Sequence, residues 1–311
     1  GIVGCAAIDD YINGVIKKHE NTREEKEQDR IRHVNACNAQ TGPIFLCYRD
    51  QKEIDVCVER IKKAQEPLYN FTSVDRVHNR IWKVSAEQDI LFLQNAFEQI
   101  GEIYIADGHH RCASAVKVGL KRRQEDPMPT GDKEYDFFLS VLFPDNQLMI
   151  MDYNRVVRDL NGMDAEAFLQ KISGNFQISK PQANVIVPAA KGQFGLYLEN
   201  KWYLLEAAKD ICSADVVEGL DVSILQRYIL EPVLGIKDPR TDKRIDFVGG
   251  IRGMEELEHR CREDMKLAFA MYPTSIQELF RVADADRLMP PKSTWFEPKL
   301  LSGLFIHDIM N

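Results

Sequence analysis

Ile103-Tyr104-Ile105-Ala106-Asp107-Gly108-His109-His110-Arg111, followed by Cys112-Ala113-Ser114-Ala115-Val116, predicts a strand, a tight polar turn and a helix. The alternating β-branched and aromatic residues favour a short buried strand, which the Asp-Gly pair breaks. The Ala-rich run that follows contains no Pro and favours a helix. The polar turn therefore lies at the N-terminus of a helix.

This turn has the composition of an anion-binding site. Unpaired backbone N–H groups and the positive end of the helix dipole attract anions, and His109, His110 and Arg111 add donors. Gly108 allows close backbone approach, and a guanidinium can hold two oxygens of one phosphate. Asp107 either orients these donors or holds a divalent metal, Mg²⁺, that bridges phosphate oxygens. A purely structural role stays open, because Asp-Gly is a common turn and a His can cap a helix.

At these residues the chain resembles the ParB/sulfiredoxin superfold, whose members carry a Gly-x-x-Arg type turn between a strand and a helix as their phosphate site. The Asp107–Arg111 variant is similar to the domain-of-unknown-function family ten-fifteen and to the free-serine kinases that share the superfold. Further segments extend the resemblance over nearly the whole chain: His19-Glu20-Asn21-Thr22, Asp29-Arg30, Gly42-Pro43-Ile44-Phe45 and Met289 to Leu300.

The chain also departs from this family. After Arg111 the family usually has Tyr, Glu and Thr, whereas this chain has Cys112, Ala113 and Ser114. Family members carry a further segment before the strand that opens at Gly1, so the resemblance implies that an N-terminal part of the first domain is missing here.

Composition narrows the class of protein. With 44% hydrophobic and 28% charged residues, the chain is typical of globular proteins. A net charge of −8 argues against binding to nucleic acid or anionic membranes, unlike chromosome-segregating ParB proteins. The seven Cys are scattered without a Cys-x-x-Cys pair, which favours reduced thiols in the cytoplasm. No apolar run approaches the roughly 20 residues that span a bilayer.

The 311 residues exceed the usual domain size of about 100 to 200, so two domains are expected. The predicted fold is α+β: a ParB/sulfiredoxin-like mixed sheet with helices over residues 1–157, and a second mixed α/β domain over 158–311. The pattern changes between Val157 and Gly162.

The predicted strands and helices follow the periodicity of apolar residues and the turn signals. The expected helices cover 22–39, 55–64, 90–100, 165–172, 222–234 and a segment from Met254. Helix 22–39 has only a weak apolar stripe, so its charged residues are expected to face water. The expected strands cover 1–8, 44–48, 80–84, 245–248 and 267–271, with a hairpin-like passage from Asp9 to Lys18 and hairpins over 137–151 and 195–205.

Glu20 is the best candidate for a general base. It precedes a helix and, in the superfold, this element faces the phosphate turn; the resemblance to the kinases implies a catalytic role for Glu20. A carboxylate near bound phosphates can accept the proton of an attacking hydroxyl. The alternative is an acid favoured at a helix start by the dipole alone. The same two alternatives, a catalytic role and a structural role at the start of the helix, apply to His19. Thr22 with Glu25 fits a capping box for this helix.

A Pro-bounded loop near the C-terminus is the second candidate region. Pro290-Pro291 and Glu297-Pro298 favour an extended path without helix or sheet. Trp295 and Phe296 can anchor it, which leaves Lys292, Ser293 and Thr294 free to contact phosphate or an acceptor substrate. Lys299 is the less favoured binding residue, and a structural Pro-rich wrap is the alternative for the loop.

Other chemistries fit less well. Adjacent His109 and His110 point in different directions and lack a partner at i+4 spacing for zinc. Sulfiredoxin chemistry needs a Cys within the turn, whereas Cys112 follows Arg111. The dinucleotide fingerprint and the Gly-Lys-Ser of a P-loop are both absent.

The leading hypothesis is a nucleotide-dependent phosphotransferase that acts on a small hydroxyl compound, with free L-serine favoured by the resemblance. Gly108 to Arg111 would hold the phosphates of ATP or ADP, Asp107 and His110 would act in catalysis with Asp107 on Mg²⁺, and Glu20 would be the base. The alternatives are a nonenzymatic nucleotide- or metabolite-binding regulator and, less favoured, a nuclease. The expected partners are a small-molecule substrate and a nucleotide, and a homodimer stays open.

Overall fold

The computed structural model describes residues 1–74, 76–297 and 299–310. Within these ranges the strands form two large sheets and three two-stranded ladders. The first sheet has the order β1-β8-β4-β7-β2 and is mixed, because β4 runs parallel to β8 and β2 parallel to β7 while the other neighbours are antiparallel. Its strands are β1 (Ile2–Ala7), β2 (Ile16–Lys17), β4 (Ile44–Tyr48), β7 (Ile103–Asp107) and β8 (Phe137–Pro144).

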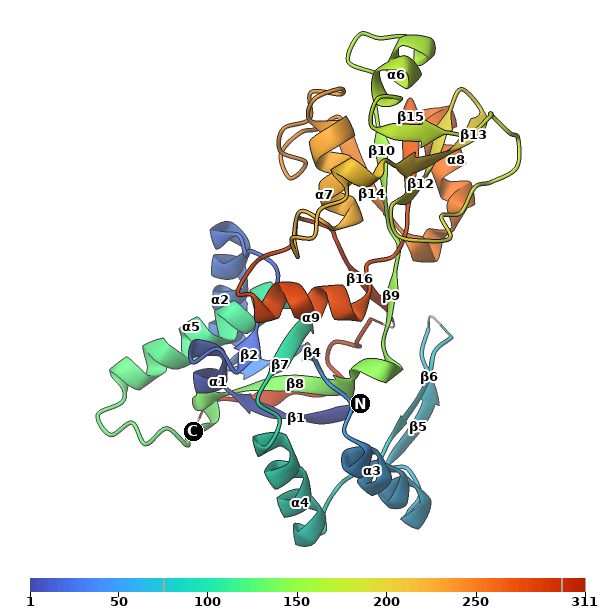
Figure 1. The fold of residues 1–311 in the computed structure, drawn as a ribbon. Helices are drawn as coiled ribbons and strands as arrows, with labels where there is room; N and C mark the ends of the chain where they lie inside the picture. The colour runs from blue at the N-terminus through green and yellow to red at the C-terminus, as the bar shows by residue number, and fades with distance from the viewer. Residues whose placement is uncertain (75, 298, 311) are drawn as a thin grey trace.

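The central strands of this sheet are buried on both faces, which explains their unbroken apolar sequence. In β4, Ile44, Leu46 and Tyr48 pack into one core with the surrounding helices, whereas Phe45 and Cys47 pack into a second core that continues into the other half of the molecule. The helices of this half are α1 (Ile8–Ile12), α2 (Glu24–Cys37), α3 (Lys52–Ala64), α4 (Glu87–Glu98) and α5 (His109–Glu125). The ladder of β5 (Tyr69–Thr72) and β6 (His78–Ile81) lies beside α3 (Figure 1).

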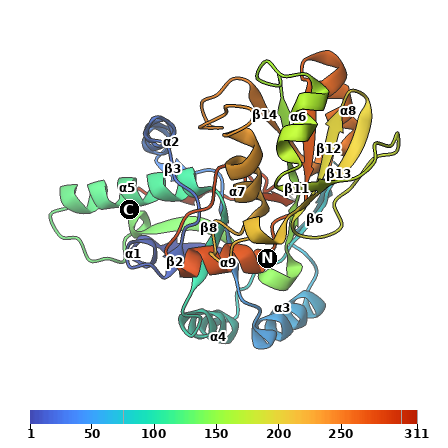
Figure 2. The same cartoon turned by 45° about the horizontal axis from the view of Figure 1, so that its top comes forward.

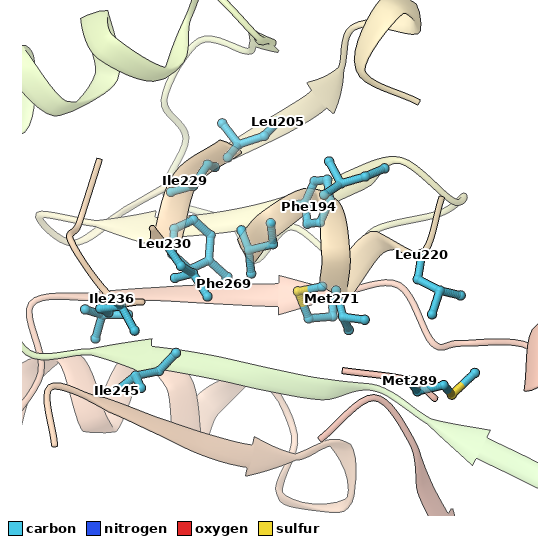
Figure 3. Close-up of a cluster of buried hydrophobic side chains, with 14 of the residues drawn as sticks. Phe194, Leu205, Leu220, Ile229, Leu230, Ile236, Ile245, Phe269, Met271 and Met289 are labelled. Carbon is cyan, nitrogen blue, oxygen red and sulfur yellow. The ribbon is translucent and has the colours of Figure 1, made fainter. Parts of the chain in front are cut away.

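The second sheet is antiparallel throughout, with the order β11-β13-β12-β15-β10-β14. A large apolar cluster covers one of its faces (Figure 3), where Phe194, Leu205 and Phe269 from the strands meet Ile229 and Leu230. Its strands are β10 (Tyr153–Val157), β11 (Phe176–Ile178), β12 (Gln193–Leu198), β13 (Lys201–Ala207), β14 (Ile245–Gly249) and β15 (Leu267–Met271). Its helices are α6 (Ala165–Ile172), α7 (Asp221–Leu225) with a π-helical turn over Gln226–Leu230, and α8 (Met254–Glu263).

The last part of the chain returns to the first sheet. Helix α9 (Ile276–Asp284) lies between the two halves (Figures 1 and 2), where the ring of Phe280 stacks on Tyr104 of β7 at 4.1 Å. Asp284 forms ion pairs with Lys17 and Arg49. Beyond α9, β16 (Trp295–Glu297) pairs with β9 (Met149–Met151), and β17 (His307–Asp308) pairs with β3 (Ala39–Gln40). Residues distant in sequence are therefore brought to the strand that ends in the polar turn.

The predicted α+β fold with a mixed sheet is confirmed. Helix 165–172 has the predicted bounds, with the Asp164 side chain as its N-cap. The hairpin of β12 and β13 turns at Glu199 and Asn200, which both have positive φ. The two-domain division stays a prediction; β10, which the boundary at residue 157 assigned to the first domain, pairs in the second sheet.

Several local predictions are wrong. Segments 137–143 and 148–151 form no hairpin, because a 3₁₀ turn at Asp145–Gln147 sends β9 to β16 while β8 fills the sheet between β1 and β4. The passage after Asp9 contains helix α1 rather than a hairpin. The expected strand over 80–84 ends at Ile81. The Pro-bounded loop contains strand β16, and helix α9 was not predicted.

The capping box expected at Thr22 is also wrong. Helix α2 begins at Glu24, and its N-cap residue, Arg23, makes no side-chain cap. The expected helix over 222–234 starts as α7 and then widens into the π-helical turn, so the regular helix is short.

Candidate functional site

The polar turn forms where β7 ends and α5 begins. Gly108 is the N-cap residue of α5 with φ +97°, in the left-handed region that favours Gly. A Cβ atom placed on Gly108 would lie 2.9 Å from Nη2 and 3.1 Å from Nε of Arg111. The guanidinium therefore lies directly against the backbone of the turn, in space that any other residue type would fill.

The start of α5 exposes its own donors. The first intrahelical bond runs from the N–H of Cys112 to the carbonyl of Gly108 at 2.9 Å, so the N–H groups of residues 109 to 111 have no intrahelical acceptor. No acidic residue occupies the first turn. These N–H groups and the positive end of a 17-residue helix can therefore act on an anion from outside the helix.

Two buried His side chains support the turn. The rings of His19 and His109 meet edge to face, with centroids 4.4 Å apart, and their exposed fractions are 2% and 5%. The backbone N–H of His19 donates to Nε2 of His109 at 3.4 Å, so the neutral ring of His109 carries its proton on Nδ1. Burial lowers the pKa of His19 to about 4 and lowers that of His109 well below its ordinary value. Both rings are therefore neutral at pH 7.

Glu20 lies next to this pair. Its carboxylate oxygen Oε2 is 3.9 Å from Nδ1 of His109, and 43% of its side chain is exposed. Burial raises the pKa of the Glu20 carboxyl, the cation of Lys292 opposes this increase, and the negative charge of Asp107 adds to it. A carboxylate with a raised pKa that remains open to solvent is suited to accept a proton.

His110 and helix α2 form another wall of the site. Nε2 of His110 accepts a hydrogen bond from the backbone N–H of Arg23 at 3.0 Å, which leaves Nδ1–H of the neutral ring as a donor. Burial and the neighbouring Lys26 lower the pKa of His110. His110 therefore fixes the start of α2 against the turn and presents a neutral donor.

Arg111 and Asp107 face each other across the turn. Nη2 of Arg111 is 3.7 Å from Oδ2 of Asp107, and Nζ of Lys299 lies at the same distance from that oxygen. Nε of Arg111 is buried and has no hydrogen-bond partner within the described residues. An unsatisfied donor on a guanidinium beside free backbone N–H groups is suited to bind a phosphate oxygen.

Two clefts meet at this turn. The larger, of about 470 Å³, is lined by the turn from Asp107 to Arg111, by Glu20, and by residues of α2 that include Lys26, Arg30 and Arg32. The smaller, of about 160 Å³, is lined by His19, Tyr153, Lys292, Ser293, Thr294, Trp295 and Lys299, among others. Glu20 and Asp107 line both clefts. The two carboxylates therefore stand where the contents of one cleft would meet those of the other.

The predicted loop residues take different positions. Lys292 has a positive φ of 60°, and its Nζ lies over the ring of Tyr153, 5.4 Å from the centroid. Ser293 is buried and donates its hydroxyl to the carbonyl of Pro290 at 2.6 Å, so that proton already holds the loop. Thr294 lines the small cleft.

The structure thus brings together all the predicted site residues: Glu20, Asp107, Gly108, His109, His110, Arg111, Lys292, Ser293 and Thr294. The sequence analysis missed the basic residues of α2, which it treated as a solvated face. The spacing of Lys26 and Arg30 at i and i+4, on a helix with a weak apolar stripe, was the available signal. It also missed Tyr153, which belongs to another sheet.

A magnesium ion fits the donor set in one respect. Mg²⁺ is typically held by one or two carboxylates together with substrate phosphates, and Glu20 and Asp107 are the two carboxylates common to both clefts. In the described part of the chain, no group of three or more His, Cys, Asp and Glu side chains is arranged to hold a metal by itself. None of the described helices has the length and apolar character needed to cross a bilayer.

The fold and site define a class: an α+β protein with a strand–Gly–helix turn that borders two clefts on a mixed sheet. The chain belongs to the family described as "Protein of unknown function (DUF1015)", whose sequence profile matches residues 1–223. The family resemblance of the sequence is thereby confirmed. No curated protein matches the chain.

Several solved structures are similar to this chain at low sequence identity. SbnI from Staphylococcus aureus, with a C-terminal truncation, is 11% identical with a TM-score of 0.52, covering 98% of this chain and 87% of its own. A free serine kinase in complex with AMP is 12% identical with a TM-score of 0.48, covering 96% and 88%. A conserved hypothetical protein from Pyrococcus furiosus is 13% identical with a TM-score of 0.44, covering 97% and 93%. The likeness to SbnI shows that the two chains share a fold.

Proposed function

We propose that this protein is a nucleotide-dependent phosphotransferase that transfers a phosphoryl group to the hydroxyl of a small metabolite, with free L-serine as the favoured acceptor. The observation that carries the proposal is the pair of clefts that share Glu20 and Asp107. Transfer between two bound substrates needs a donor site and an acceptor site that meet at the reacting atoms.

The larger cleft is the proposed donor site for ATP or ADP. The N–H groups at the start of α5, the Nδ1–H of His110 and the guanidinium of Arg111 all belong to its wall. Lys26 and Arg30 of α2 also line this cleft, interspersed with the acids Glu25 and Asp29. These donors would bind the phosphates and stabilise the charge that develops on them during transfer.

The smaller cleft is the proposed acceptor site. Its size suits a small metabolite, and Lys292 offers a cation for a carboxylate group at the end of the cleft that faces Tyr153. The hydroxyl of the acceptor would then lie near Glu20. Free serine carries a carboxylate and a hydroxyl on a short carbon chain, besides its α-ammonium group, which is why it is the favoured acceptor.

In the transfer step, the acceptor hydroxyl oxygen forms a bond to the terminal phosphorus as the bond between this phosphorus and the bridging oxygen breaks. The hydroxyl proton passes to a carboxylate oxygen of Glu20, and the shortened nucleotide leaves with the electron pair of the broken bond. Nδ1 of His109, which carries the proton of the neutral ring, lies 3.9 Å from Oε2 of Glu20, close enough to act on its charge without a direct hydrogen bond. Asp107 would hold Mg²⁺, which would supply charge neutralisation to the phosphates.

The experiment is a product assay with ATP or ADP and L-serine, using E20Q, H110A and R111A variants. Loss of nearly all turnover in each variant is the expected result, because each loses a base or a phosphate ligand. E53Q and R262A are matched controls, since both residues are exposed on helices that border neither cleft. Intact turnover in R111A or E20Q would contradict the proposal, and nucleotide binding without turnover for any hydroxyl acceptor would leave the protein a binding module.

A further inference from the structure

A third cavity, of about 330 Å³, borders the loop that carries Lys292 but belongs to neither cleft of the site. Strand β10, the π-helical turn, the segment after Ile236, strand β14 and the loop at Pro290 build its wall. Part of this wall is apolar, including Leu230 and Phe247, and part is cationic.

The charges that line this cavity are unbalanced. Arg155, Lys237 and Arg240 are cations, and among the described lining residues the one acid is Asp238. Asp238 is already engaged by Arg240, with Nε to Oδ1 at 2.9 Å and Nη2 to Oδ2 at 2.8 Å. Three positive charges against one negative charge leave the lining at +2, in a chain whose net charge is −8.

Arg155 is the central cation of this cavity. Its exposed fraction is 4%, and its guanidinium donates to the carbonyls of Tyr153 and Lys292, the latter at 3.0 Å. In the part of the chain that the structure describes, no carboxylate forms an ion pair with it, and burial lowers the pKa of Arg155 to about 10. The guanidinium also lies over the ring of Phe247, 5.5 Å from its centroid. A buried guanidinium that meets two neutral carbonyls and an aromatic ring but no carboxylate is incompletely compensated, so an anion beside it would be stabilised.

Gln226 gives a second, independent observation. Its Nε2 donates to the carbonyl of Ile236 at 2.8 Å, which fixes the amide, while its buried Oε1 has no partner within the described residues. Gln226 begins the π-helical turn, and single π-helical turns inside helices occur often at functional sites. An unpartnered acceptor favours a ligand that also carries a hydroxyl or amino group.

We propose that this cavity is a second ligand site, which binds a small organic anion. The carboxylate or phosphate of this ligand pairs with Arg155 and Lys237, and the apolar part of the ligand lies against Leu230 and Phe247. Arg155 also holds the carbonyl of Lys292, so a ligand here acts on the loop that lines the small cleft. This site does not depend on phosphoryl transfer, because its chemistry is fixed by its own residues.

The test is calorimetric titration of the full chain carrying R111A, so that the polar turn contributes little anion binding. L-lactate and inorganic phosphate are the two probes; they distinguish a carboxylate ligand from a phosphate ligand. We expect at least one probe to bind with one site per chain. The variant K237A/R240A removes exposed charges and should weaken this binding about tenfold or more.

A matched control removes the same charge elsewhere. K180A/K201A changes two exposed lysines that line none of the three cavities and should leave the affinity within about twofold. R155K keeps the charge but loses the planar fork, and should weaken binding while thermal unfolding stays cooperative. Failure of both probes to bind, or equal affinity in K237A/R240A and its control, would overturn the proposal.

Discussion

Replacing Gly108 with Ala should have two effects, one on the folding stability of the protein and one on nucleotide binding by Arg111. An L-residue at φ +97° costs about 1–2 kcal/mol of folding free energy. For a chain of 311 residues, with an unfolding entropy of about 2.1 cal/mol/K per residue, that corresponds to a decrease in Tm of about 1.5–3 °C. The new Cβ would also meet the guanidinium of Arg111 at 2.9 Å and displace it from the turn. Loss of charge-assisted hydrogen bonds from this fork should weaken nucleotide binding about 10- to 100-fold.

Gly14 provides the matched control. It has a similar positive φ of 80°, but a Cβ there has no neighbour within 4 Å. G14A should therefore lose stability like G108A but keep its nucleotide affinity. Thermal unfolding measures the first effect, and calorimetry with ATP and ADP measures the second. Unchanged nucleotide binding in G108A, or equal loss of binding in both variants, would refute the role of the Arg111–backbone contact.

Three further predictions concern titration and the contact of α9 with the first sheet. Because burial raises the pKa of Glu20, the activity of the wild type should rise with pH through that raised value. E20Q should unfold at a higher temperature than the wild type at pH 7 and lose this advantage below pH 4.5, where the carboxyl is neutral in both the folded and the unfolded state. Burial lowers the pKa of His19 from 6.5 to about 4, so the stability gained by burying its neutral ring should be lost as pH falls from about 6.5 towards 4. In denaturant titrations, the free energy of unfolding should therefore fall less steeply with decreasing pH in H19Q than in the wild type. The hydroxyl of Tyr104 donates a hydrogen bond to Asp284 at 2.6 Å, so Y104F should lose about 1–2 kcal/mol of unfolding free energy, while the exposed control Y69F loses none. Equal unfolding free energies in the two variants would mean that this contact does not anchor α9.

Local sequence patterns were sufficient to predict an element where its own residues decide its backbone conformation. The strand, Gly and helix around Gly108 were predicted because an apolar run, an Asp-Gly break and an Ala-rich run each favour one backbone state. The hairpin at Glu199 was predicted for the same reason. Strand partners were harder to predict. The hairpin expected between β8 and β9 is wrong, because strand pairing depends on which surfaces meet across the whole chain and leaves little local trace.

The candidate site shows the same division. Its charged turn was visible in the sequence, since Gly108, His109, His110 and Arg111 are adjacent. Helix α2 was interpreted as a solvated face, although Lys26 and Arg30 line the larger cleft. A helix shows in its sequence which face is apolar, but a polar face that borders a cleft resembles one that borders water.

By itself, the sequence determined that a polar turn with an anion-binding composition follows a buried strand, because that arrangement is fixed by residues within one helical turn of each other. Only the tertiary structure decided that Glu20 and Asp107 are common to two clefts, and that the loop of Lys292 closes the smaller one. Helix α9 packs on Tyr104 of β7 and strand β16 pairs with β9, which together bring that loop to the turn. Such contacts arise from burial of apolar surface between distant segments, and burial on that scale depends on the whole chain.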